Sequence, residues 1–75
     1  MLRKRSFTLA NHRTSVALEQ EFWLALERLA ARRGSTLSAL IYRTDVAREA
    51  KQPLASALRV LALDAAMHSS LIRNQ

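Results

Sequence analysis

The residues best suited to chemistry are Arg13, Ser15 and Ala17, which alternate with other side chains just before the sequence becomes helical. Residues two apart in a β-strand lie on one face, so these three share a face of a strand over residues 12–18. The opposite face holds Thr14, Val16 and Leu18. Arg13 can pair with guanine, Ser15 can bond to several bases, and Ala17 can meet a thymine methyl group. The pattern predicts contact with base edges in the major groove of DNA; the alternative is an ordinary edge strand with solvated side chains.

The elements around this strand indicate how it is positioned. The sequence after it is helical, so we expect the strand to have no partner within its own chain, and unpaired backbone groups along a half-apolar strand are costly. The simplest remedy is the same strand from a second copy. A chain of 75 residues also builds only a modest core unless it shares that core. The sequence therefore predicts a homodimer with an antiparallel two-stranded ribbon.

Composition narrows the classes of function. The chain has no cysteine, and its two histidines, His12 and His68, lie far apart, so we expect no metal, no cofactor and no enzyme activity. We expect no membrane span and no signal peptide, and hence a cytoplasmic protein. The net charge of +6 favours a polyanion as partner, with nucleic acid first and an anionic membrane second.

Residues 1–11 are predicted to form a basic N-terminal arm and a short extended segment. Arg3, Lys4 and Arg5 supply its charge and are expected to follow DNA phosphates. Residues 6–9 alternate again, and whether they pair with the main strand is left open. Ala10 and Asn11 can turn the chain, because asparagine tolerates left-handed backbone angles.

Two helices are predicted next. The first runs from Glu19 to about Arg33, where Gly34 ends it, and Trp23 is expected to be a core or dimer-interface aromatic. The second begins after an expected N-cap at Thr36, continues its inward face to Val46 or Arg48, and offers first-turn backbone amides to a phosphate. The expected phosphate-binding residues there are Thr36, Leu37, Ser38 and Ala39. The expected dimer core comprises Val16, Leu18, Phe22, Trp23, Leu26, Leu29, Leu37, Leu40 and Ile41.

A third helix is predicted over residues 53–68, because Pro53 ends the second helix and suits a first helical turn. Its apolar stripe comprises Leu54, Ala57, Leu58, Leu61, Ala62 and Ala65, and is widened by Val60, Leu63 and Met67. So wide a face is expected to be buried on the dimer. Residues 69–75 are expected to form a tail.

The order of these features resembles the ribbon-helix-helix proteins of the Arc/MetJ superfamily. The resemblance is carried by Arg13–Leu18, by the helix from Glu21 to Ala30, and above all by Gly34–Tyr42. It implies a ribbon-helix-helix domain over residues 12–50, mostly α with one β-strand, in an intertwined homodimer. It also implies base reading by Arg13, Ser15 and Ala17 and phosphate contacts from the second helix. The third helix resembles a bacterial subfamily that carries an added C-terminal helix.

The function expected first is a sequence-specific DNA-binding protein, a transcriptional repressor or autoregulator. One alternative is an antitoxin whose C-terminal helix binds a toxin, a possible protein partner. A second is a structural dimerisation module, or a basic membrane-surface protein. A membrane-surface protein would need several cations along the polar side of the third helix, where only Arg59 lies. Whether dimers assemble further on DNA is left open.

Overall fold

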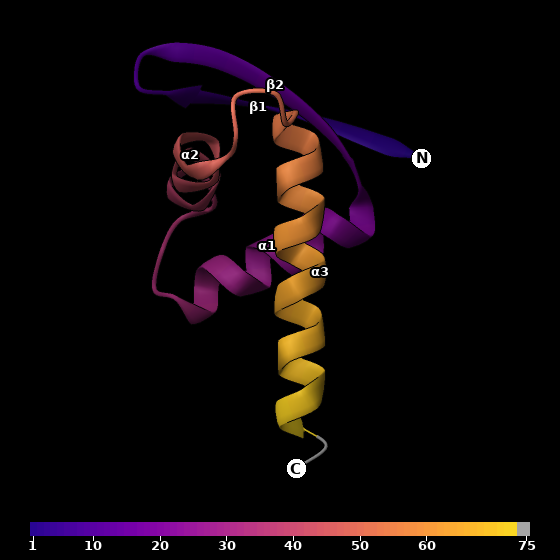
Figure 1. Cartoon of the computed structure of the whole chain (residues 1–75). Helices are drawn as coiled ribbons and strands as arrows, with labels where there is room; N and C mark the ends of the chain where they lie inside the picture. Colours follow the sequence, from indigo (N-terminus) through magenta and orange to yellow (C-terminus); the bar gives the residue numbers. More distant parts are fainter. Residues whose placement is uncertain (74–75) are drawn as a thin grey trace.

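The chain folds as a β-hairpin followed by three helices (Figure 1). This computed structural model describes residues 1–73 and the side chains of residues 1–68. The elements are β1 (Leu2–Leu9), β2 (His12–Glu19), α1 (Gln20–Arg32), α2 (Leu37–Ala47) and α3 (Leu54–Arg73). The hairpin lies across one end of the molecule, and α3 extends away from it (Figure 1). The fold is therefore mostly helical, as predicted.

The hairpin corrects the prediction of a single strand. β1 pairs antiparallel with β2 along its whole length, from Leu2 opposite Glu19 to Leu9 opposite His12. Ala10 and Asn11 form the connection with φ values of 49° and 70°, as a tight type I′ turn requires. The expectation that the main strand has no partner in its own chain is thus wrong, and residues 6–9 do pair with it.

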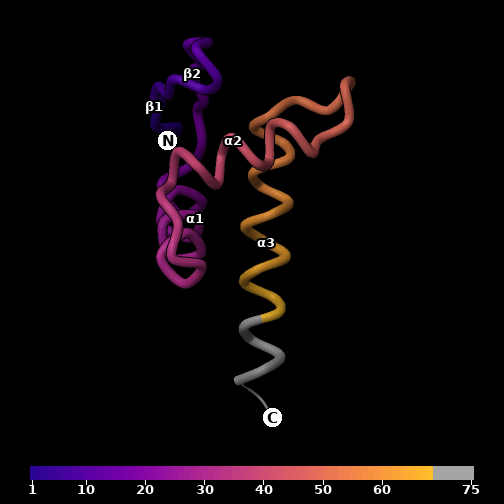
Figure 2. Tube along the Cα trace, turned by 90° about the vertical axis from the view of Figure 1, so that its left-hand side faces the viewer, coloured from indigo at the N-terminus to yellow at the C-terminus, as the bar shows by residue number. Residues whose placement is uncertain are grey.

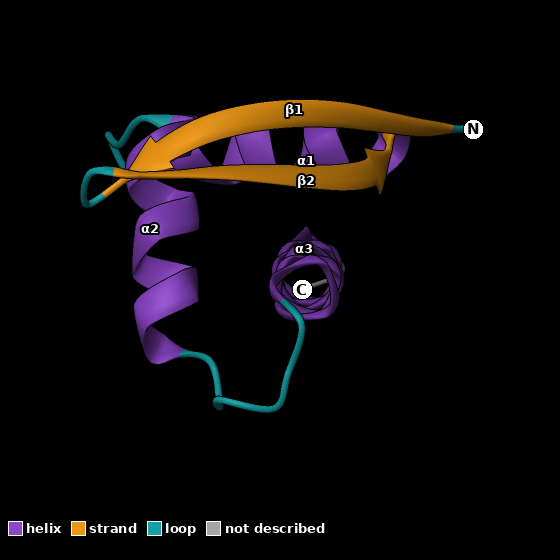
Figure 3. Ribbon diagram, turned by 90° about the horizontal axis from the view of Figure 1, so that it is seen from above, coloured by secondary structure: helices purple, strands orange, loops and turns teal. Residues whose placement is uncertain are grey.

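The N-terminal segment forms a strand because its side chains also alternate. Arg5, Phe7 and Leu9 lie on the inner face of the hairpin, where Leu9 is buried and the other two are half-buried. Seen from above, the hairpin covers α1 (Figure 3). The three consecutive cations at the start of β1 are therefore part of a sheet and do not form a separate arm.

α1 ends where its glycine predicts. Gly34 has a φ of 64°, a left-handed conformation that glycine adopts without the steric cost of a Cβ atom. The amide of Ser35 donates to the Ala30 carbonyl at 2.9 Å, and the amide of Gly34 donates to the Ala31 carbonyl at 3.1 Å. This paired arrangement satisfies the last carbonyls of the helix and turns the chain toward α2.

α2 and α3 also begin at the predicted residues. Thr36 caps α2, since its Oγ1 accepts a hydrogen bond from the Ala39 amide at 3.0 Å. α3 follows Pro53 and continues to Arg73, so it is longer than the predicted helix; residues 74–75 of the expected tail lie outside the described part of the chain. In Figure 2 the hairpin and α1 form one layer, α3 forms the other, and α2 joins them.

One chain builds a core from all five elements. The buried cluster comprises Leu9, Val16, Leu18, Trp23, Leu26, Leu29, Ala30, Leu40, Ile41, Leu58 and Ala62. α3 packs against α1, α2 and β2, so its inner stripe covers apolar surface that we expected only a second copy to cover. Leu26, Leu40 and Ile41, which we expected in the core of a dimer, are therefore already buried within one chain.

The outer side of α3 is left uncovered by the single chain, so its expected burial on the dimer stays a prediction. Val60, Leu63 and Met67 are 58%, 57% and 57% exposed, because the stripe that contacts the core is narrower than the apolar face of the helix. Val46 in α2 is likewise exposed, and the inward position at the end of that helix belongs to half-buried Arg48.

Candidate nucleic-acid interface

The outer face of β2 presents the three residues that the sequence singled out. Arg13 and Ser15 are exposed and Ala17 is half-buried. Their neighbours Val16 and Leu18 are buried on the opposite face, and Thr14 is half-buried there. This alternation fixes the orientation of β2, since a shift by one residue would expose the apolar set. Arg13, Ser15 and Ala17 are thus held side by side on one outward surface.

β1 adds a second row to this surface, which the sequence reasoning missed. Lys4, Ser6 and Thr8 are all exposed, and they lie opposite Ala17, Ser15 and Arg13 respectively. Cross-strand partners share a face of the sheet. The two central hydroxyls confirm this placement, because Ser6 Oγ and Ser15 Oγ are 2.9 Å apart. The alternation of residues 4–9 was the signal that could have identified the row.

Arg5, one of the expected phosphate ligands, lies on the inner face. Its guanidinium is 4.9 Å from the ring centroid of Trp23, and its Nη2 is 3.4 Å from Glu27 Oε1. Arg3 pairs with buried Leu18 and so belongs to the same face of β1, although its side chain is exposed. Of the three N-terminal cations, only Lys4 lies on the outer face.

Trp23 holds β1 against the helices. The indole is fully buried, and its Nε1 donates to the Arg3 carbonyl oxygen at 2.8 Å. Its ring centroid is 5.9 Å from that of Phe7. Trp23 is therefore a core residue. Its contacts with Arg5 and Phe7 hold β1 with its inner face toward α1.

The start of α2 supplies backbone donors beside the hairpin. The first amides of a helix have no partner within the helix, and in α2 these include Leu37 and Ser38. The amide of Ala39 differs because it donates to Thr36 Oγ1. Among the four residues expected to bind phosphate here, Ala39 is therefore the one whose amide is already used. α2 packs against β1 and begins close to the hairpin turn (Figure 3).

The acidic end of the outer surface is neutralised. Glu19 closes β2, and Arg59 Nε of α3 donates to Glu19 Oε1 at 3.0 Å. A hydrogen bond from its own backbone amide, followed by the bond from Arg59, lowers the pKa of Glu19 from its usual value of 4.5. Arg59 also lies over the Phe22 ring, 5.9 Å from its centroid. The carboxylate is thus engaged with α3, which leaves Arg13 and Lys4 to set the charge of the outer surface.

The expected dimer core lies mostly inside the single chain. Val16, Leu18, Trp23, Leu26, Leu29, Leu40 and Ile41 are buried there, and Phe22 and Leu37 are half-buried. Phe22 and Leu37 are consequently the members of that set with surface left for a second copy.

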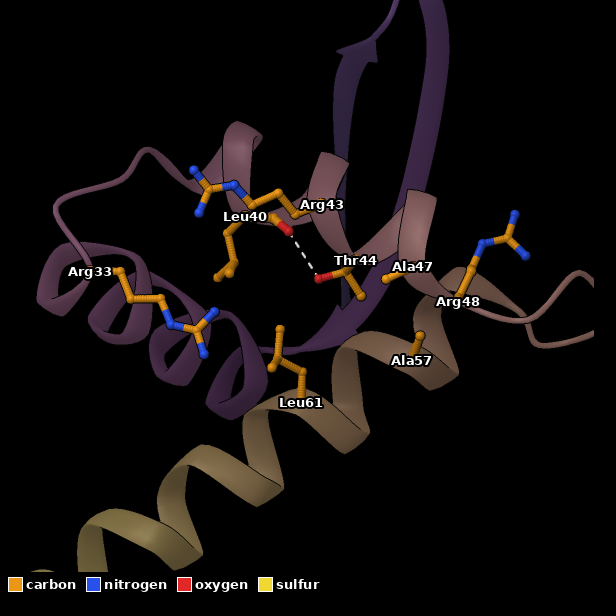
Figure 4. A pocket seen from close by; sticks show the side chains of 8 residues that line it. All are labelled: Arg33, Leu40, Arg43, Thr44, Ala47, Arg48, Ala57 and Leu61. Carbon is orange, nitrogen blue, oxygen red and sulfur yellow. Dashed lines mark hydrogen bonds between the residues drawn. The ribbon is translucent and has the colours of Figure 1, made fainter.

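A groove lies between α1, α2 and α3 (Figure 4). Leu40, Ala57 and Leu61 line it. Arg48 points away from its centre, and its Nε donates to Asp45 Oδ1 at 2.8 Å.

No group of three metal-binding side chains occurs in the described part of the chain. No helix within the described residues is both long and apolar enough to cross a membrane.

Comparison with known proteins identifies the domain. The model of the ribbon-helix-helix domain family matches residues 2–66, which include the hairpin, α1, α2 and most of α3. Neither the curated proteins nor the solved structures gave a match. The family is typically non-enzymatic, and it implies DNA binding and dimerisation. The chain therefore belongs to the ribbon-helix-helix family of DNA-binding, dimeric regulators.

Proposed function

We propose that the protein is a sequence-specific DNA-binding regulator, acting as a transcriptional repressor or autoregulator. In this proposal β2 strands from two copies pair antiparallel and enter the major groove. The observation that supports it best is the outer face of β2, where Arg13 and Ser15 are exposed while Val16 and Leu18 are buried behind them. Arg13 is the side chain able to make a bidentate contact to guanine.

The start of α2 fits the phosphates that flank such a groove. Backbone amides at a helix N-terminus favour anions because they donate hydrogen bonds and lie at the positive end of the helix dipole. Leu37 and Ser38 supply these amides, and Ser38 adds an exposed hydroxyl. The Thr36 hydroxyl accepts from Ala39, so its own proton is available to a phosphate oxygen. These contacts would position the ribbon without reading sequence.

The proposal is tested by selection from a random DNA library, followed by binding measurements on selected and random DNA at equal salt. Arg13→Ala should lower affinity for selected DNA about 5- to 150-fold per contact, since one bidentate pair contributes roughly 1–3 kcal/mol of discrimination. Affinity for random DNA should fall much less. Arg28→Ala is the matched control, because Arg28 is an exposed arginine of α1.

Two results would contradict this function. One is a selection that enriches no sequence, and the other is an Arg13→Ala protein that loses affinity equally on both DNAs. Ser38→Ala should weaken binding to both DNAs alike, and only mildly, because the backbone amides remain.

An antitoxin role is a second candidate, and it rests on the outer side of α3. Val60, Leu63 and Met67 repeat every three or four residues and are more than half exposed, a spacing that suits contact with a protein partner. The test is whether expressing a neighbouring reading frame stops growth and co-expressing this chain restores it. Leu63→Glu should then abolish rescue without changing DNA affinity. Membership of a DNA-binding family speaks against a purely structural module.

A further inference from the structure

We propose that β1 forms a phosphate-binding rail on each side of the DNA-reading ribbon, with Lys4 and Thr8 as its contacts. This inference rests on the proposed function, in which β2 strands from two copies pair in the major groove. It assigns a role to the outer face of β1, which the proposed base contacts of β2 do not use.

The first step concerns the edge of β2 that remains open. In a hairpin with a two-residue turn, the pair beside the turn exchanges hydrogen bonds, and alternate pairs follow the same pattern. That pair is Leu9 and His12, so the backbone groups of Arg13, Ser15 and Ala17 are directed to the other edge of β2. A second β2 adds at this edge. The order of the resulting sheet is β1, β2, partner β2, partner β1.

The second step compares this sheet with the groove. Neighbouring strands lie about 4.8 Å apart, so the two outer strands of four are separated by about 14 Å. The major groove of B-DNA is about 12 Å wide and admits a two-stranded ribbon. The two β2 strands therefore fill the groove, while each β1 lies at a groove wall, where the phosphates are.

The third step concerns chemistry. Lys4 is exposed on the outer face and lies opposite Ala17. Because the side chain of Ala17 is short, it does not obstruct the ammonium group of Lys4. A lysine ammonium suits a phosphate as a compact point charge, whereas bidentate reading of a base suits arginine. Thr8 is exposed in the same row and adds a hydroxyl donor. Arg5 is excluded from this role, because Trp23 and Glu27 hold its guanidinium on the inner face.

The fourth step is that the rail is rigid before DNA binds. Trp23 Nε1 donates to the Arg3 carbonyl at 2.8 Å, and its ring lies against Phe7 and the guanidinium of Arg5. These contacts attach β1 to α1 from the inner side. A phosphate-binding lysine on such a strand needs less ordering than one on a flexible arm, and this favours binding.

The experiment measures the affinity of Lys4→Gln on selected and random DNA over a series of salt concentrations. Affinity should fall on both DNAs by the same factor, and the slope of log affinity against log salt should decrease by about 2 for the dimer, one for each lysine. Lys51→Gln is the matched control, since Lys51 is the only other lysine in the sequence and is exposed in the loop between α2 and α3. Thr8→Val should lower affinity on both DNAs without changing the slope.

Circular dichroism and melting first establish that each variant folds like the parent protein. The rail is overturned if Lys4→Gln behaves like Lys51→Gln, or if it loses affinity for selected DNA only, because Lys4 would then read bases. The Arg13→Ala protein separates this failure from that of the proposed function. If Arg13→Ala still loses discrimination, only the rail fails; if it does not, the ribbon itself does not read sequence.

Discussion

Replacing Leu58 with alanine tests whether α3 is part of the folding unit. The Leu58 side chain is fully buried and belongs to the hydrophobic cluster that all five elements form. Truncation of a buried leucine to alanine costs about 2–5 kcal/mol, because burial is lost and a cavity remains. A domain of 75 residues has a free energy of unfolding of about 4–11 kcal/mol. Leu58→Ala should therefore remove about half of the stability.

The assay is thermal melting followed by circular dichroism at a fixed protein concentration, which must be equal for all variants because dimer stability depends on concentration. Each kcal/mol lowers Tm by about 4–8 °C in a domain of this size, so we expect a fall of at least about 8 °C. Leu63→Ala is the control, since it makes the same change in the same helix at a side chain that is 57% exposed. Equal Tm values for the two variants would refute the packing of α3 described above.

Two further predictions concern the ends of α1. Gly34→Ala should lower stability by about 1–2 kcal/mol, the cost of a left-handed conformation for a residue with a Cβ atom, while Gly34→Asn should cost less; equal losses in denaturant titrations would contradict this. Glu19 has a lowered pKa in the folded protein. Its bond to Arg59 therefore contributes fully to stability at pH values above the usual pKa of 4.5, and this contribution is lost as the pH falls through the lowered pKa. The Tm difference between the parent protein and Glu19→Gln should therefore shrink as pH falls below 4.5, and a constant difference would count against the contact.

The helices could be predicted from the sequence because their limits depend on nearby residues. Gly34 ends α1 through its own backbone angle, and Thr36 starts α2 by binding an amide three residues away. Pro53 likewise directly precedes the first residue of α3, but α2 already ends at Ala47, so the prediction that Pro53 ends that helix is wrong. The inward face of β2 was also predictable, since Val16 and Leu18 alternate with polar side chains.

β1 could not be predicted as easily, because its inner face depends on a distant residue. Arg5 lies opposite buried Val16 and so faces inward, where Trp23 and Glu27, both in α1, hold its guanidinium. A run of three cations otherwise resembles a solvated arm. The candidate site lacked Ser6 and Thr8 for the same reason, since they join the outer face only through pairing with β2, and Lys4 was predicted there only as part of an N-terminal arm. By contrast, the use of the Ala39 amide by Thr36 follows from a known capping spacing and could have been anticipated.

The charges of β1 also bear on how far the sheet can grow. A sheet with an open edge can recruit further strands, and this is a common route to aggregation. In the proposed dimer the β2 edges are joined, and each outer edge belongs to a β1 strand with the consecutive residues Arg3, Lys4 and Arg5. Two such edges repel each other, because like charges on facing strands destabilise pairing. These cations, of which Lys4 is also the proposed phosphate ligand, would thus end assembly at two copies, and a polyanion that neutralises them would remove this barrier to polymerisation.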